Sequence, residues 1–128
     1  MELKEIIKIL NLKVLSGKNY LDKRINGVYI SDLLSWVMSH GEKNNAWITI
    51  QIHPNIVAIA VLLELGCIII PEGIEVEEKT INKAEQENIV ILSSYMSSYE
   101  LAIELGKLGI WYEDIYRFAH SHSFIAMR

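Results

Sequence analysis

Eight residues stand just after the predicted strands of this chain, where a turn or a helix begins. They are Ser31, Asp32, His53, Asn55, Glu72, Gly73, Ser93 and Ser94. In an open α/β sheet, ligands bind beyond the carboxyl ends of the strands, and helix N-termini attract anions there. We therefore predict a binding site for a small anionic ligand at this edge. The alternative is that these residue types are ordinary helix caps and turn residues.

Of the eight residues, His53 is the one whose side chain could act either as a base or as a ligand. It precedes Pro54 at a strand end, and the N-terminus of a following helix would keep its imidazole neutral, as a base or a ligand must be. No serine, cysteine or carboxylate stands at the spacing of a catalytic triad or a metal site, so no catalytic residue is assigned. His120 and His122 share one face only in an extended segment, which makes them weak candidates for zinc.

The motifs that hold phosphates in kinases and dehydrogenases are missing. The sequence contains neither G-x-x-x-x-G-K-[ST] nor G-x-G-x-x-G. The formal net charge is −4, and no run of lysine or arginine occurs, which argues against nucleic acid as the main partner. We expect no kinase or ATPase activity and no cofactor.

An apolar run over residues 56–70 must either cross a membrane or lie inside a soluble fold. The run contains Glu64 and is shorter than the roughly 20 nearly uncharged residues that a spanning helix needs. Helix-forming residues precede Gly66, and Cys67 with three isoleucines, which suit a buried strand, follows it. Together with the β-rich stretch AWITIQI upstream, the pattern predicts a strand, a buried helix ending at a left-handed Gly66, and a second, parallel strand. No membrane association is expected.

The remaining segments alternate between helical and extended patterns. Helices are expected over residues 3–10, from a Ser31 cap to Ser39, over residues 74–88, and from a Ser97–Glu100 capping box to Gly109. Strands are expected at LKVLS, GVYIS and IVILS. The predicted fold is a single α/β domain, residues 1–110, with a mostly parallel sheet flanked by helices.

Several side chains carry more specific expectations. We expect Leu33, Leu34, Val37 and Met38 to face the core, and Glu75 to pair with Lys79 on an acidic helix. Cys67 is the one cysteine, so no internal disulfide can form, and a buried strand position would make it a small hydrophobe. The charged opening MELKEIIKIL is unlike a secretory signal, so a cytoplasmic protein is expected.

The C-terminal segment, residues 111–128, differs in composition from the rest. It holds five of the 11 aromatic residues of the chain. Aromatic side chains bury large areas and anchor interfaces. We predict that this segment packs as a helix, either on its own domain or on a second subunit.

Three blocks of the chain resemble the DRTGG domain over residues 1–110. They are LDKRINGVYISDLLSWVM, AWITIQIHPNIVAIAVLLELGCIIIPEGIEV and KAEQENIVILSS. That family resembles the N-terminal domain of HPr kinase/phosphorylase, an α/β module without a kinase site, and related domains occur beside CBS modules. The resemblance implies a regulatory or assembly role, self-association and nucleotide sensing nearby.

The two signatures that give the family its name are largely replaced. The Asp-Arg pair aligns near His53 and Pro54, and the Thr-Gly-Gly turn aligns near residues 71–73, where only Gly73 is kept. Glu72 adds negative charge where a phosphate would lie, so phosphate binding at this turn is disfavoured.

Three functions remain, in order of preference. The first is a non-catalytic regulatory or protein-interaction module of the DRTGG type that forms a homodimer. The second is a sensor that binds a small ligand, such as a nucleotide, at the carboxyl ends of the strands. The third is a small enzyme that uses His53.

Overall fold

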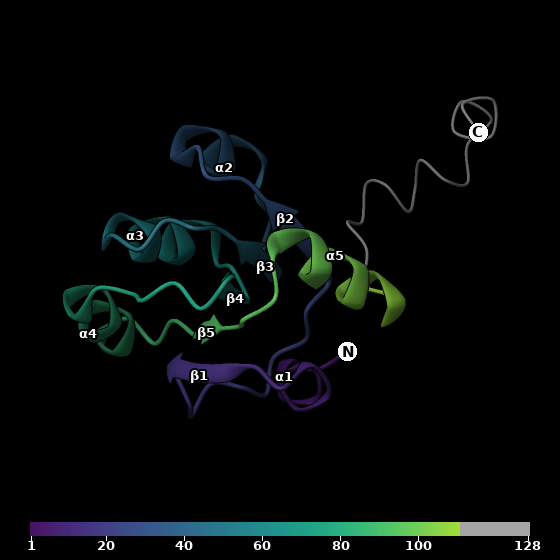
Figure 1. The fold of residues 1–128 in the computed structure, drawn as a ribbon. Helices are drawn as coiled ribbons and strands as arrows, with labels where there is room; N and C mark the ends of the chain where they lie inside the picture. The colour runs from purple at the N-terminus through teal and green to yellow at the C-terminus, as the bar shows by residue number, and fades with distance from the viewer. Residues whose placement is uncertain (111–128) are drawn as a thin grey trace.

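Five strands form one sheet in the computed structural model, which describes residues 1–110 (Figure 1). They are β1 (Lys13–Ser16), β2 (Gly27–Ile30), β3 (Asn45–Ile48), β4 (Cys67–Ile70) and β5 (Ile91–Ser93). Their order is β1-β5-β4-β3-β2. Strands β2 to β5 are parallel, and β1 joins β5 in the antiparallel direction. The prediction of an α/β domain with a mostly parallel sheet is confirmed.

Five helices cover the two faces of this sheet. They are α1 (Leu3–Leu10), α2 (Leu34–His40), α3 (Asn55–Leu63), α4 (Glu78–Gln86) and α5 (Ser98–Lys107). Strands β2 to β5 follow one another in sequence order, and successive right-handed crossovers place their connecting helices on the same side. Helices α2, α3 and α4 therefore share one face, and α1 and α5 cover the other (Figure 1).

The central strands are buried on both faces, as their continuous apolar runs predicted. Alternate residues point to opposite sides of a strand, so β4 contributes Cys67 and Ile69 to the core under α1 and α5, and Ile68 and Ile70 to the core under α2, α3 and α4. The predicted strand–helix–strand unit of β3, α3 and β4 is confirmed, with β3 and β4 directly paired.

A buried polar network holds β1 against its neighbours. The Ser16 hydroxyl donates to the Ile89 carbonyl at 2.8 Å and accepts from the Ile91 amide at 3.0 Å. The Gly17 amide donates to the Glu85 carboxylate at 2.8 Å. These bonds compensate for the irregular pairing that interrupts the β1–β5 ladder after Val14.

The end of α3 differs from the prediction. The left-handed residue that ends the helix is Glu64, with φ 55°, and Gly66 has an ordinary negative φ. Position 66 is nevertheless tightly packed, because a Cβ there would collide with the tip of the Ile25 side chain and lie 3.1 Å from the Asn44 carbonyl oxygen. Gly66 thus serves close packing rather than backbone reversal.

The prediction for α2 was wrong in two respects. The helix begins at Leu34, and Ser31 does not cap it, because the backbone after β2 is first held by β3: the Trp47 indole donates to the Ser31 carbonyl at 2.9 Å. Val37 is buried and Leu34 partly buried, but Leu33 and Met38 are exposed. Helix α2 lies at the β2 edge of the sheet, so it has α3 on one side and no other helix of residues 1–110 beyond it (Figure 1).

Helix α4 also starts later than expected. It begins at Glu78, so Glu75 lies outside the helix, and Lys79 pairs instead with Glu77 at 3.5 Å. The capping box at the start of α5 is confirmed: Ser97 accepts from the Glu100 amide, and the Glu100 carboxylate accepts from the Ser97 amide.

Some predictions concern residues beyond those described. The packed C-terminal helix and the weak zinc candidates His120 and His122 lie outside residues 1–110. No helix within that range is long and apolar enough to cross a membrane. No group of three or more His, Cys, Asp or Glu side chains in the same range could hold a metal ion.

Candidate functional site

A crevice opens at the carboxyl end of the sheet, where the loops after β4 and β5 meet the start of β1. The chain that leaves β4 runs to α4 on one face, and the chain that leaves β5 runs to α5 on the opposite face (Figure 1). Adjacent strands whose connections diverge in this way leave space between them, where ligands of α/β proteins commonly bind. Because β1 is antiparallel to β5, the start of β1 also reaches this edge: Lys13 lies opposite Ser93.

A cavity of about 730 Å³ lies at this crevice. Its lining residues are Asn11, Leu12, Lys13, Leu15, Gly73, Ile74, Glu75, Val76, Glu78, Ile81, Ser93, Ser94 and Tyr95. Four of its apolar residues, Leu15, Ile74, Val76 and Ile81, also pack on the core under α2, α3 and α4. This volume lies within the roughly 300–1,000 Å³ typical of small-molecule sites. A cavity with apolar and polar walls can take a ligand that has both an apolar and a hydrogen-bonding part.

Two backbone hydrogen bonds hold the loops after β4 and β5 together. The Gly73 amide donates to the Ser94 carbonyl at 2.8 Å, and the Glu72 amide donates to the Met96 carbonyl at 2.9 Å. A Cβ on Gly73 would lie 2.8 Å from two carbons of the Tyr95 ring, which is exposed and could turn away, so it is the backbone conformation, φ 63°, that favours glycine here. The Tyr95 side chain is 94% exposed at the cavity wall.

Two serines stand at the end of β5. The Ser94 hydroxyl accepts from the Met96 amide at 3.0 Å, which fixes the turn after the strand. The Ser93 hydroxyl makes no hydrogen bond with residues 1–110 and is partly exposed in the cavity lining. Ser93 can therefore bond to a ligand without breaking an existing interaction.

The charges around the cavity are of both signs. Lys13 comes from β1, and Glu75 and Glu78 come from the segment that leads into α4. None of the three makes an ion pair within the described part of the chain. Since carboxylates outnumber lysine, the cavity favours hydroxyl groups or a single anionic group over a polyanion.

Ser31 and Asp32 belong to a separate cluster at the ends of β2 and β3. The Asp32 carboxylate accepts from the Thr49 hydroxyl at 2.8 Å and from the Ile50 amide at 2.9 Å. The Gln51 side-chain amide donates to the Asp32 carbonyl at 3.0 Å. These contacts tie the two strand ends together, and neither Ser31 nor Asp32 lines the cavity.

His53, Asn55 and Glu72 also lie at the predicted edge, but none of them lines the cavity. The His53 Nδ1 atom accepts from the Asn55 amide at 3.4 Å, a local contact at the start of α3. Glu72 is an exposed turn residue with φ 59°. Of the eight predicted residues, the structure thus gathers Gly73, Ser93 and Ser94 around one cavity.

The residues that the sequence analysis missed come from β1 and the two residues before it, from the segment between β4 and α4 and the start of α4, and from Tyr95 after β5. Asn11, Lys13 and Leu15 line the cavity because β1 runs antiparallel to its neighbour. A signal for this existed. The connection over residues 17–26 is polar and contains no helix, so it could not be a parallel crossover from β1 to β2.

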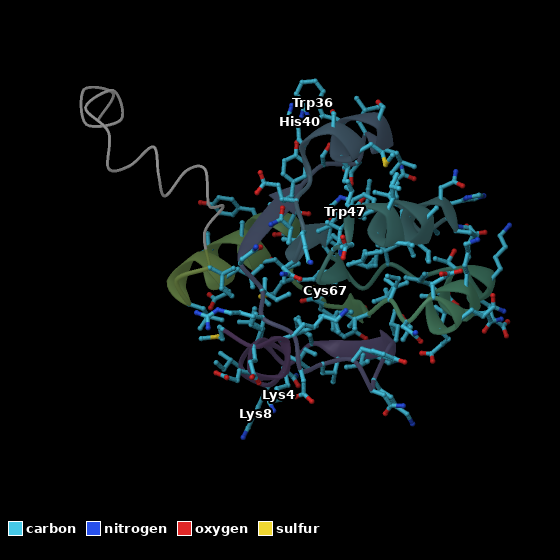
Figure 2. The ribbon with its side chains drawn as sticks, turned by 180° about the vertical axis from the view of Figure 1, so that it is seen from behind. Lys4, Lys8, Trp36, His40, Trp47 and Cys67 are labelled. Atoms are coloured by element: carbon cyan, nitrogen blue, oxygen red, sulfur yellow. The ribbon has the colours of Figure 1, made fainter. Side chains whose placement is uncertain are left out.

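Cys67 has no part in this site. It is fully buried in β4, in the middle of the molecule (Figure 2), and burial raises the pKa of its thiol to about 12. A thiol with so high a pKa stays protonated at neutral pH and is a poor nucleophile.

Comparisons with known proteins agree with this architecture. A family model described as the DRTGG domain matches residues 5–108. A solved structure of the CBS and DRTGG domains of the regulatory region of Clostridium perfringens pyrophosphatase, complexed with the activator diadenosine tetraphosphate, is similar at a TM-score of 0.61 and 15% sequence identity. The match covers 79% of this chain and 44% of that one. Among curated proteins, no sequence matches this chain significantly.

Proposed function

Because this chain belongs to the DRTGG domain family, we propose that it is a non-catalytic regulatory module, a cytoplasmic homodimer that responds to a small ligand. The observation that carries the proposal is the cavity at the β4–β5 crevice, where Gly73, Ser93 and Ser94 meet the start of β1. A site built from loops of opposite faces and from an edge strand can couple ligand binding to the arrangement of those elements. Such coupling is what a regulatory module requires.

The chemistry of the cavity supports a nucleoside-like ligand. The exposed Tyr95 ring can stack on a planar base, and the carboxylates of Glu75 and Glu78 can accept hydrogen bonds from sugar hydroxyls. Lys13 can pair with one phosphate group. The two carboxylates would repel a chain of phosphates, so we expect nucleosides and nucleoside monophosphates to bind better than dinucleoside polyphosphates.

Thermal denaturation with a panel of nucleosides, nucleotides and phosphosugars tests this ligand class. A ligand at about 100 times its dissociation constant adds roughly 2.7 kcal/mol to the free energy of unfolding, because it binds only the folded state. We expect Tyr95→Ala to remove this stabilisation. Tyr20→Ala, which alters another exposed tyrosine outside the cavity, should leave it unchanged.

Two outcomes would contradict the site as proposed. If no member of the panel raises the melting temperature, the ligand class is wrong, and the module works through protein contacts alone. If a ligand stabilises Tyr95→Ala as well as the parent but not His53→Ala, the site lies at the end of β3 instead.

Catalysis is tested separately, with labelled ATP and magnesium. We expect no phosphoryl transfer to protein or to small acceptors, because transfer needs positioned cations around the phosphates. The described cavity offers one lysine and two carboxylates. Stoichiometric transfer that a single substitution in this chain abolishes would show that the module is an enzyme.

A further inference from the structure

Helix α3 is apolar around its whole circumference, yet only one side of it is covered. Every residue after Asn55, through Leu63, is Ala, Val, Ile or Leu. Helices of this kind are normally found inside proteins. In the described domain Ile56 and Ala60 are buried, but Val61 is 42% and Leu62 64% exposed. The predicted buried helix is therefore half-buried in a single copy of the domain.

The neighbouring helix α2 extends this apolar surface. Helix α2 contacts α3 on the same face of the sheet and contains no Asp, Glu, Lys or Arg. Leu33 is 62% exposed and Trp36 52% exposed, one helical turn apart. Figure 2 shows Trp36 stacked on His40 and directed away from the body of the molecule. We call Leu33, Trp36, Val61 and Leu62 the α2–α3 face.

Charged residues border this surface on the side of α4. A groove of about 340 Å³ between α3 and α4 is lined by Ala58, Val61, Leu62, Lys83 and Glu87. Neither Lys83 nor Glu87 makes an ion pair within residues 1–110. An apolar centre with a charged rim is the usual anatomy of a protein–protein interface.

We propose that the α2–α3 face is the surface on which a second copy of this chain docks, forming a two-fold symmetric dimer. The proposal rests on the homodimer proposed above and specifies its surface. Each chain has a net charge of −4, so two copies approach most readily through a face whose own side chains are uncharged. At the rim, two-fold symmetry would let Lys83 of each copy meet Glu87 of the other.

The size of the face fits this occupant. Large apolar side chains that are about half exposed leave on the order of 100 Å² each for contact. Four such side chains from each copy supply about 800 Å², so the rim must supply about a third of the roughly 1,200 Å² at which the range of specific interfaces begins. Trp36 is the expected anchor, because tryptophan is enriched among residues that dominate binding energy.

Light scattering on the full chain tests the proposal. We expect the parent to have twice the 14.7 kDa mass of one chain, and Leu62→Glu to raise the dimer dissociation constant about thirtyfold or more. The matched control is Ile9→Glu, which adds the same charge at an exposed isoleucine of α1, on the opposite face of the sheet. This control should remain dimeric. Unchanged circular dichroism would show that both variants are folded.

A charge exchange at the rim gives a second, independent readout. Lys83→Glu and Glu87→Lys should each weaken the dimer severalfold, and the double variant should restore it. If Leu62→Glu, Lys83→Glu and Glu87→Lys all remain as dimeric as the parent, the docking surface is wrong and the homodimer stands. A parent that is monomeric at about 100 µM, far above the micromolar range of specific interfaces, would overturn both, because residues 111–128 or another protein would then cover the face.

Discussion

Replacement of Gly17 by alanine is expected to lower the free energy of unfolding by roughly 3 kcal/mol. Gly17 has φ 74°, a conformation that costs residues with a Cβ about 1–2 kcal/mol. The added methyl would also lie 2.9 Å from the Ile89 carbonyl oxygen and from the Val90 Cα, and these backbone atoms cannot move aside without disturbing β5. A shift of residue 17 away from β5 would also strain the bond from its amide to Glu85.

Urea denaturation of Gly17→Ala and Gly106→Ala provides the comparison. Gly106 lies in α5, and a methyl added there would have space, because no neighbouring atom of residues 1–110 outside its own helix backbone lies within 4 Å. Alanine at position 106 should therefore stabilise the domain by about 0.5–1 kcal/mol. Glycine-to-alanine substitution is thus expected to lower the free energy of unfolding at position 17 and to raise it at position 106. Equal effects at both positions would contradict the close approach of residue 17 to β5.

The Cys67 thiol is expected to react with a thiol reagent at pH 8 on the order of a thousandfold more slowly in the folded than in the unfolded protein. The reason is that the thiolate is the reactive form, and burial raises the pKa of Cys67 to about 12, whereas an exposed cysteine has a pKa of about 8.5. The released chromophore of a disulfide reagent, followed with and without denaturant, measures the ratio. A folded protein that reacts as fast as the unfolded one would show that Cys67 is accessible.

The raised pKa of Cys67 also makes the free energy of unfolding depend on pH in the alkaline range. Below about pH 8.5 both states keep the thiol proton, and Cys67 has no effect. Above that pH the unfolded state releases the proton while the folded state retains it, so the free energy of unfolding falls by about 1.4 kcal/mol per pH unit until pH reaches the folded pKa of about 12. Cys67→Ala should remove this component of the slope, and an unchanged slope would contradict it.

Much of the fold could be predicted because local patterns determined it. Continuous apolar runs predicted the buried strands, and the Ser97–Glu100 capping box predicted the start of α5. The predictions failed where tertiary contacts decide the outcome. Ser31 looked like a helix cap, but the bond from Trp47 holds it in the strand connection. The apolar sequence of α3 indicated burial on all sides. Whether the outer side of the helix is covered depends on what packs against it, and the residues of the helix do not determine that.

The site was only partly predictable for a related reason. The carboxyl ends of parallel strands share an edge, so Gly73, Ser93 and Ser94 could be grouped from the sequence. The contribution of Lys13 depends on the direction of β1, which its own residues do not encode. Asp32 has the right chemistry and lies at the right edge, but its Oδ1 atom binds Thr49 and Ile50 and its side chain does not line the cavity.

The place of β1 in the sheet has a consequence for the order of folding. Strands β2 to β5 come from one continuous segment, residues 27–93, and each pairs with the next along the chain. Lys13 of β1 instead pairs with Ser93, about eighty residues away, so β1 joins only after the longest loop in the sheet has closed. Since Asn11, Lys13 and Leu15 line the cavity, we expect the binding site to be completed last during folding. By the same linkage, a ligand in the cavity would hold the first strand in place and delay its release.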